Sequence, residues 1–353
     1  MNKPIYQVLS MDQIRSLPWN GFNVISTFSG GGGSSTGYRM AGFNVLWANE
    51  FIDAARDTYR ANMAPHTILD GRDIREVKAS EILTAIKMKP GELDLFDGSP
   101  PCSSFSTAGK RQEGWGKIKK YSDKAQRTDD LFFEYIRLLR GLKPKTFVAE
   151  NVSGLVKGSA KGCFIEIMRE LKASGYRVSC KILDAKWLGV PQSRQRTIFV
   201  GVREDLGINP AHPAPLHYYY TVGEAVESLI KKGDAKWLKH GTDTHRYWVV
   251  TKAGAPLSNA CKKLTGKNSF LTHVKQSPHR QANTITQGTQ QLYHWSEPRT
   301  LTIQELHRIG GFPDDFKLIG DFTQRWERIG RAVPPVMMSH IAATVRDKIL
   351  NKI

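Results

Sequence analysis

The segment from residue 23 to residue 50 constrains the fold more than any other part of the chain. Asn23–Phe28 is typical of a strand, and it runs into a glycine-rich turn, SGGGGSSTGY, at residues 29–38. Glycines permit a tight turn and let backbone N–H groups approach a ligand closely. We expect a helix next, and then a second strand, Phe43–Ala48, that ends at Glu50. A carboxylate at that position can accept hydrogen bonds from a ribose, so this order of elements predicts a nucleoside-binding α/β sheet.

A second motif places a cysteine at the end of another strand. The apolar run Leu93–Phe96 predicts a buried strand, and the sequence DGSPPC follows it at residues 97–102. The two prolines stop the strand, because neither can donate to a sheet ladder. Cys102 is therefore expected at the carboxyl edge of the sheet, where open α/β sheets bind ligands. As a thiolate it could attack carbon, although a lone cysteine is more often a small buried hydrophobe.

Further polar residues follow later strands. Asp73 comes after a short apolar stretch and could meet an adenine amino group or cap a turn. Glu150 ends the short strand Thr146–Ala149, next to the position expected for the Cys102 strand. Arg194 and Arg196 would share one face of an extended chain, because strand side chains alternate.

The charge of the chain indicates a polyanionic partner. The 353 residues carry a formal net charge of +18, which favours nucleic acid. Seven Lys or Arg residues against two acids lie between Gly109 and Arg127, in a segment suited either to holding phosphates or to being a solvated charged loop. The four cysteines form no CxxC pair, so neither a zinc knuckle nor a disulfide framework is expected. With no apolar run of ~20 residues, we expect a soluble, intracellular protein without membrane contact.

Composition predicts one large domain and one smaller domain. We expect a catalytic, cofactor-binding domain at residues 1–203, completed by 330–353. Residues 204–298 are rich in Tyr, Trp, His, Thr and Lys, which predicts strands and loops that contact bases and phosphates or pack a small core. Residues 299–329 would return the chain to the first domain. Within them, Thr302 and Glu305 predict a capping box that begins a helix, Ile303–Ile309.

Taken in order, these motifs resemble the DNA cytosine-5 methyltransferase family over nearly the whole chain. The matching motifs are Phe28-x-Gly30-x-Gly32-Gly33, Glu50, Asp73-Ile74, Pro101-Cys102 with Phe105-Ser106, Glu150-Asn151-Val152, Gln192-x-Arg194-x-Arg196, Arg299-x-Leu301-Thr302 through Gly311-Phe312-Pro313, and Gly330-x-Ala332-Val333-Pro334-Pro335. The resemblance implies a Rossmann-like, S-adenosylmethionine-dependent methyltransferase sheet with a smaller, β/loop-rich target-recognition domain.

The resemblance also implies a mechanism and a set of site residues. A cytosine is flipped out of duplex DNA, Cys102 adds to its C6 atom, and C5 accepts a methyl group from S-adenosylmethionine. Glu150 would balance charge at N3, Arg196 would hold O2 and orient Glu150, and Arg194 would contact phosphate or support the others. The expected cofactor-binding residues are Phe28, Gly30, Gly32, Gly33, Glu50, Phe51, Asp73, Ile74, Ser99, Pro101, Leu131, Arg331 and Ala332. No metal is expected.

One position departs from the family pattern. The last motif usually begins Gly-Asn, whereas this chain has Gly330-Arg331. An arginine beside a sulfonium cation is unfavourable unless an anion offsets it. Arg331 could turn toward DNA phosphate or an acidic neighbour. Alternatively, it could bind the extra carboxylate of carboxy-S-adenosylmethionine, which would yield 5-carboxymethylcytosine.

The sequence leaves other functions open. One alternative is an RNA cytosine-5 methyltransferase, which an assay on transfer RNA and on duplex DNA would distinguish. Another is a DNA-binding module without catalysis, which would form no covalent adduct with its target. A nicotinamide oxidoreductase would explain the glycine turn but not the Pro-Cys and Glu-Asn-Val motifs. The expected partner is double-stranded DNA, with a cognate restriction endonuclease as a further candidate. We expect a monomer in the cytoplasm of a prokaryotic or phage-infected cell.

Overall fold

The computed structural model describes residues 3–101, 130–156, 161–229, 234–270, 272–288 and 291–353, and the backbone of residues 119–121 and 124–126. The chain divides into two compact units. Unit 1 comprises Met1–Met11, Ala185–Arg194 and Pro215–Met337, and unit 2 comprises Asp12–Asp184, Gln195–Ala214 and Met338–Ile353.

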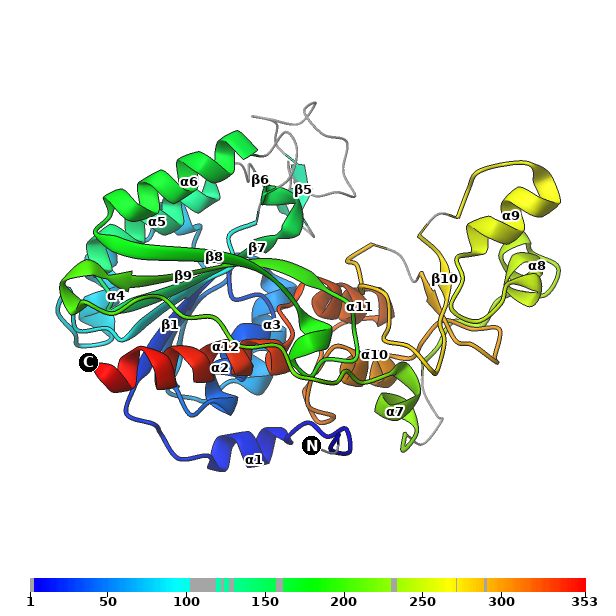
Figure 1. Cartoon of the computed structure of the whole chain (residues 1–353), viewed down its shortest axis with the longest axis horizontal. Coiled ribbons are helices and arrows are strands. Elements are labelled where there is room, and N and C mark those ends of the chain that lie inside the picture. Colours follow the sequence, from blue (N-terminus) through cyan, green and yellow to red (C-terminus); the bar gives the residue numbers. More distant parts are fainter. Residues whose placement is uncertain are drawn as a thin grey trace. The chain divides into compact units, whose positions relative to one another are not determined.

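A seven-stranded sheet forms the centre of unit 2 (Figure 1). Its strand order is β3-β2-β1-β4-β7-β9-β8, in which β9 runs antiparallel to both of its neighbours and the other pairs are parallel. The strands of this sheet are β1 (Asn23–Thr27), β2 (Asn44–Asn49), β3 (Ile68–Asp70), β4 (Leu95–Gly98), β7 (Thr146–Val152), β8 (Tyr176–Asp184) and β9 (Gln195–Arg203). A separate antiparallel pair consists of β5 (Lys119–Tyr121) and β6 (Lys124–Gln126).

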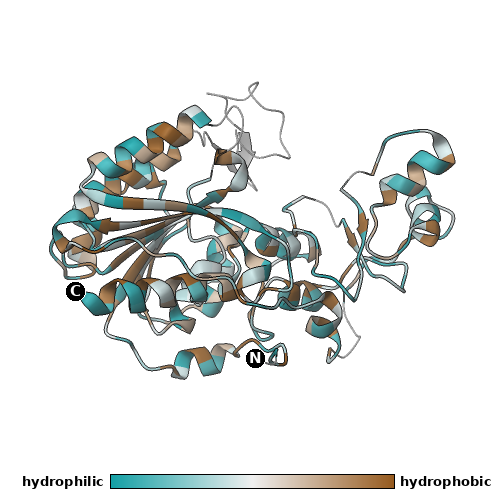
Figure 2. Ribbon diagram, in the orientation of Figure 1, coloured by the Kyte–Doolittle hydropathy of each residue, from teal (hydrophilic) through white to brown (hydrophobic). Residues whose placement is uncertain are grey.

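Helices cover both faces of this sheet (Figure 1). The helices of unit 2 are α2 (Gly33–Met40), α3 (Asp53–Asn62), α4 (Ala79–Ala85), α5 (Leu131–Leu142), α6 (Lys161–Ala173), most of α1 (Met11–Ser16) and most of α12 (Pro335–Lys348). Residues of α4, α5 and α6 share one buried cluster with Ile25, Phe96 and Phe147 of the strands. The central strands are accordingly hydrophobic along most of their length (Figure 2). Because strand side chains alternate, Ser26, Asp97 and Glu150 lie on the opposite face of the sheet, the face of α2.

The end of β4 packs so closely against its neighbours that no side chain fits at Gly98. A Cβ atom added at Gly98 would lie 2.5 Å from Cε2 of Tyr135 and 2.7 Å from Oγ1 of Thr27. Tyr135 is fully buried, and its hydroxyl donates to the carbonyl oxygens of Phe96 and Val148. The strand that leads to Cys102 is thereby fixed from both sides up to its last residue.

Most described residues of unit 1 lie in loops, and most of its regular secondary structure is helical. It contains the helices α7 (Val222–Val226), α8 (Asp243–Val250), α9 (Leu257–Thr265), α10 (Ile303–Ile309) and α11 (Phe322–Arg331), and a parallel pair of two-residue strands, β10 (Val274–Lys275) and β11 (Leu292–Tyr293). Helices α8 and α9 pack on each other through a small core that includes Tyr247, Trp248, Leu257 and Cys261. The predicted capping box is confirmed, because Thr302 accepts from the backbone of Glu305 and the Glu305 carboxylate accepts from the backbone of Thr302.

Most described residues of the segment 204–298 lie in loops, as expected, but helices and not strands make up most of its regular structure. Three helices and two short strands form there among the described residues. The aromatic residues Tyr247 and Trp248 face the small core from a helix, where sequence composition indicated strands. The N-cap of that helix, Thr242, accepts from the backbone of His245, which begins a helix in a stretch with little apolar periodicity. In the part of the chain that the structure describes, no helix is both long enough and apolar enough to span a membrane.

Candidate active site

The glycine-rich turn follows β1 and presents backbone to open space. Phe28, Gly30 and Gly32 have φ angles of 54°, 55° and 98°. A left-handed conformation costs a non-glycine residue about 1–2 kcal/mol, so Phe28 is held in a strained position of the kind that clusters at functional sites. A Cβ atom at Gly30 would meet no protein atom within 4 Å. Helix α2 then begins at Gly33, with its first residues buried.

Glu50 joins this turn to the end of β2. Its two carboxylate oxygens accept from the backbone N–H groups of Gly30, at 2.8 Å, and Ile52, at 2.7 Å. The residue is 8% exposed. A carboxylate offers about four lone-pair positions, so two bonds to backbone leave acceptor capacity for ribose hydroxyls. The open turn and this acid fit the nucleoside part of S-adenosylmethionine.

The other expected cofactor residues of unit 2 occupy the same edge or the core beside it. Asp73 caps a 3₁₀ turn, Ile74–Glu76, by accepting from the backbone of Arg75, and it also pairs with the Arg75 side chain at 3.0 Å. Ile74 and Leu131 are buried in the core shared with α5. Phe51 follows Glu50 and accepts from Arg56 through its carbonyl oxygen. Ser99 donates its backbone N–H to Thr27, and Pro101 is the last described residue before position 119.

Glu150 and Arg196 form an ion pair at the same end of the sheet. Strands β7 and β9 pair with Val152 opposite Arg196, and Nε of Arg196 lies 2.7 Å from Oε1 of Glu150. The side chains of Arg196 and Glu150 are 14% and 11% exposed, respectively. Charge-assisted bonds of this kind are stronger and more directional than neutral ones. Arg196 therefore fixes the orientation of the carboxyl group.

Asn151 ties β7 to the segment that leads to the cysteine. Its Nδ2 atom donates to the carbonyl oxygen of Pro100 at 3.1 Å, and its Oδ1 atom accepts from the backbone of Val152. The sequence matches this residue to a motif but gives it no role. Cys102 lies outside the described residues, and so does the basic segment Gly109–Arg127 except for the backbone of residues 119–121 and 124–126.

Asp97 is a polar residue that the sequence does not mark as a site residue. It is 1% exposed, and its carboxyl group accepts from Ser26 Oγ at 2.6 Å and from the Tyr38 hydroxyl at 3.0 Å. Burial, together with the nearby charge of Glu150, raises the pKa of Asp97 to about 7. An aspartate before a glycine has the sequence pattern of a turn, and only its strand register places it in the interior.

Arg194 and Arg331 lie in unit 1. Arg194 precedes β9, is 2% exposed, and donates to the carbonyl oxygens of Ile285 and Gly330 at 3.0 and 2.9 Å. Arg331 is the last residue of α11, followed by Ala332, and its guanidinium lies 2.6 Å from Oε1 of Glu327. The sequence leaves several interactions open for the Arg331 side chain, and the structure shows the contact with an acidic neighbour.

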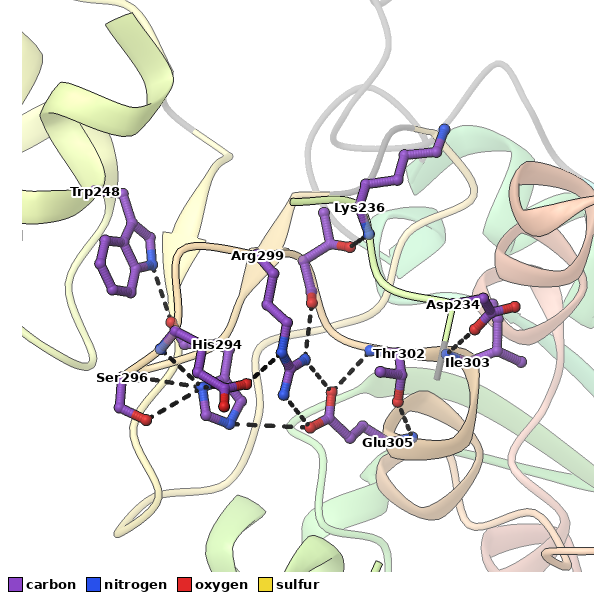
Figure 3. Close-up of polar contacts among 11 residues, drawn as sticks. Asp234, Lys236, Trp248, His294, Ser296, Arg299, Thr302, Ile303 and Glu305 are labelled. Carbon is purple, nitrogen blue, oxygen red and sulfur yellow. Dashed lines mark hydrogen bonds and ion pairs between the residues drawn. The ribbon is translucent and has the colours of Figure 1, made fainter. Parts of the chain in front are cut away.

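Unit 1 also contains a cavity of about 540 Å³ whose electrostatics do not suit DNA. Four glutamates and one arginine contribute to its lining. The arginine, Arg299, forms a bidentate ion pair with Glu305, which in turn caps α10 at Thr302 (Figure 3). Trp248 donates to the carbonyl oxygen of His294, so the same network connects α8 to this segment (Figure 3). The charged residues that line the cavity therefore connect α10 to its neighbouring segments. The candidate active site is the sheet edge of unit 2.

Comparisons with known proteins agree with this fold and site. The family model described as C-5 cytosine-specific DNA methylase matches residues 22–347. The Type II methyltransferase M1.HphI of Haemophilus parahaemolyticus is 32% identical over 91% of this chain and 86% of its own length. M.NgoFVII of Neisseria gonorrhoeae, also a Type II methyltransferase, is 30% identical over the same shares.

Solved structures share the fold. A DNA modification methyltransferase encoded within a prophage (E. coli) superposes with a TM-score of 0.71 at 23% identity, covering 94% of this chain and all of that chain. Spodoptera frugiperda DNMT2 superposes with a TM-score of 0.64 at 17% identity, covering 90% and 98%.

A sheet edge with a glycine turn after β1, a buried acid after β2 and a Glu–Arg ion pair fits the nucleoside-dependent transferases of Rossmann-like fold. More narrowly, the chain belongs to the C-5 cytosine-specific DNA methylase family. It is a DNA cytosine-5 methyltransferase, and membership of the family implies S-adenosylmethionine as the cofactor and DNA as the substrate.

Proposed function

We propose that the chain methylates C5 of a flipped-out cytosine within a specific duplex sequence, through a covalent bond between Cys102 and C6. The observation that carries the proposal is the Glu150–Arg196 ion pair. Its glutamate lies on β7, the strand next to the one that leads to Cys102. A carboxyl group oriented at that edge can interact with N3 of a pyrimidine while a thiolate attacks C6. Asn151 supports this placement, because it binds the carbonyl oxygen of Pro100.

The steps conserve atoms and charge. The Cys102 thiolate forms a bond to C6, and a proton shared between Glu150 and N3 balances the charge that moves into the ring. C5 thereby becomes nucleophilic, and S-adenosylmethionine supplies the methyl group that C5 accepts. Solvent water, acting as the base, then takes the C5 proton; the electron pair of the C5–H bond re-forms the C5–C6 double bond, and the C6–S bond breaks to return the thiolate. Arg196 orients Glu150 and holds O2, while Arg194 supports the segment that precedes β9 through its bonds to carbonyl oxygens.

For the methyl donor, we propose S-adenosylmethionine rather than its carboxylated analogue. The Arg331 guanidinium lies 2.6 Å from the Glu327 carboxylate, so an anion that offsets its charge is already present within α11. The contacts proposed for the nucleoside come from the turn at Phe28–Gly33 and from Glu50, with Asp73 at the adenine. Incubation with each donor followed by mass analysis of the nucleosides should give 5-methylcytosine and no 5-carboxymethylcytosine. Donor choice should be unchanged in Arg331→Asn.

Residues 204–298 are proposed to recognise the target, with α8 and α9 as the DNA-binding element. Residues 236–275 contain eight Lys or Arg and one acid, Asp243. Side chains of Arg246, Lys262 and Lys263 are exposed, while one of the eight, Lys275, is buried and donates to the carbonyl oxygen of Trp248. This basic surface contrasts with the glutamate-lined cavity in the same unit, and a polyanion would favour the basic one.

The proposed assembly is a monomer that acts on DNA in the cytoplasm of a prokaryotic or phage-infected cell. The relatives named Type II methyltransferases support a cognate restriction endonuclease as its partner.

A direct assay tests the proposed reaction. Purified protein is incubated with methyl-labelled S-adenosylmethionine and either duplex DNA or transfer RNA, and the labelled nucleoside is identified by mass. We expect 5-methylcytosine in DNA at one sequence. Label found only in transfer RNA would show that the substrate is RNA and not DNA. Label on adenine or on cytosine N4 would exclude the C6-adduct mechanism.

A further inference from the structure

Asp97 is a buried carboxyl group to which the proposed reaction assigns no role. It lies one residue before the end of β4 and pairs in register with Ser26 of β1 and Val148 of β7. Both hydrogen-bond donors to its carboxyl group come from the cofactor segment: Ser26 from the strand before the glycine turn and Tyr38 from the helix after it. The group therefore lies directly beneath the edge where the glycine turn and the Cys102 segment begin.

Among the described residues, the groups that act on the Asp97 carboxyl group provide hydrogen bonds but no positive charge. The described groups that face it or feel its charge are the Ser26 hydroxyl on β1, Tyr38 on α2, Tyr59 on α3, Tyr135 on α5 and Glu150 on β7. None of these five is a cation, and Glu150 is itself paired with Arg196. Buried carboxylates are normally compensated by a cation or neutralised by a proton. A bound cation at the sheet edge would supply the missing compensation.

The cofactor of this family brings one positive charge that its product lacks. S-adenosylmethionine carries a sulfonium, whereas S-adenosylhomocysteine carries a neutral thioether. The methyl group passes from the donor to C5, so the sulfonium must come to the edge between the glycine turn and Cys102. A fixed negative charge beneath that edge would attract the donor more than the product, because buried charges interact through a low effective dielectric constant.

We propose that the Asp97 carboxylate stabilises the sulfonium of bound S-adenosylmethionine electrostatically and makes the site prefer donor over product. The proposal rests on the proposed function only in that the donor binds at this edge. Asp97 does not need to touch the cofactor and acts as a positioning residue. Since burial raises the pKa of Asp97 to about 7, the preference should develop as the pH rises through neutrality.

Calorimetric binding of the two cofactors tests the proposal. All measurements use full-length protein carrying Cys102→Ser, which removes both turnover and titration of the thiol. Dissociation constants for S-adenosylmethionine and S-adenosylhomocysteine are compared at pH 6 and pH 8, with and without Asp97→Asn. The two ligands differ only in the sulfonium charge and its methyl group, so the pH dependence of the ratio of the two constants reports on the charge.

We expect the donor-over-product ratio to rise about fivefold from pH 6 to pH 8, because one pKa unit of interaction gives tenfold over the whole titration, and to stay flat in Asp97→Asn. Near pH 7, donor binding should also release a proton into the buffer, since a nearby cation lowers the pKa of a carboxyl group. Neither product binding nor the Asp97→Asn protein should release one.

Ser26→Ala serves as the matched control, because it removes a hydrogen bond but keeps the charge. The Ser26 bond lowers the pKa of Asp97, so in this variant the ratio should still rise, but at higher pH. If Asp97→Asn weakens both ligands equally, or leaves the pH dependence of the ratio intact, the proposal is wrong and Asp97 only packs α2 against the sheet. Failure of the parent protein to bind either ligand would instead contradict the proposed function.

Discussion

The Nε atom of Arg196 lies 2.7 Å from Oε1 of Glu150, across the antiparallel pair that β9 forms with β7. Both side chains are largely buried, so the loss of one leaves the other charge without compensation. We expect Arg196→Ala to lower kcat by roughly 10²-fold or more, within the range attributed to general acid–base groups, with little change in cofactor affinity. Steady-state methylation of duplex DNA measures this.

Arg177→Ala is the control for that measurement. Arg177 lies on the neighbouring strand β8, and its side chain bonds at the surface to the Gly207 carbonyl oxygen. Equal losses of kcat in the two variants would show that the effect comes from the sheet and not from the ion pair.

Asn151 provides a test of how the Cys102 segment is positioned. Asn151→Ala removes the bond to the carbonyl oxygen of Pro100, which is worth about 1 kcal/mol. Adduct formation with 5-fluorocytosine DNA should slow roughly fivefold, while affinity for S-adenosylmethionine stays the same. A wild-type rate in rapid-quench experiments would mean that this bond does not position the segment.

Because of Asp97, the free energy of unfolding should decrease as the pH rises. Its folded-state pKa of about 7 lies above the ~3.9 of an unfolded aspartate. The folded protein therefore binds the additional proton between these values, and the free energy of unfolding decreases as the pH rises through that window. Relative to wild type, Asp97→Asn should gain about 3 kcal/mol between pH 5 and pH 8.

Urea unfolding at the two pH values measures this gain. Asp57→Asn, at an exposed ion pair on α3, should show no such change. A constant difference between Asp97→Asn and wild type at both pH values would contradict the burial of an ionisable group at position 97.

The basic face of α9 should contribute to DNA affinity by neutralising phosphates. Replacing Lys262 and Lys263 by alanine should reduce the slope of log K against log salt by about 1.8, because each phosphate that a side chain neutralises contributes ~0.9 to that slope. The matched control, Arg169→Ala with Lys172→Ala on the exposed side of α6, removes the same charge. Filter binding over a salt series distinguishes the two double variants. Equal slopes for both would show that α9 is not part of the DNA-binding surface.

The strands of the sheet were largely predictable from the sequence, whereas the side-chain contacts between neighbouring strands were not. Apolar runs bounded by turn residues locate the strands β1, β2 and β4, and the capping box locates the helix Ile303–Ile309. The Glu150–Arg196 contact depends on β9 running antiparallel to β7, with Val152 opposite Arg196. No local pattern specifies that register, because it arises from strand order in the folded sheet.

Apart from α10, the helices of unit 1 were the least predictable elements. α11 has only Trp326 and Ile329 as large buried apolar residues, so few apolar positions mark this polar segment as a helix, although Asp321 and Gln324 form a capping box. Arg331 is the last residue of α11, which explains its contact with Glu327 one turn earlier. Without the helix, the sequence alone cannot place Arg331 beside Glu327, and its charge remains open to other interpretations.

The central claim is that Cys102 forms a covalent bond to C6 of the target cytosine. A duplex carrying 5-fluorocytosine at the modified position blocks loss of the C5 substituent, so the adduct should accumulate in the presence of S-adenosylmethionine. Digestion and mass spectrometry should find the nucleotide on the peptide that contains Cys102, and Cys102→Ser should give no adduct. Methylation of the normal duplex by Cys102→Ser at the wild-type rate, or an adduct on another residue, would contradict the account.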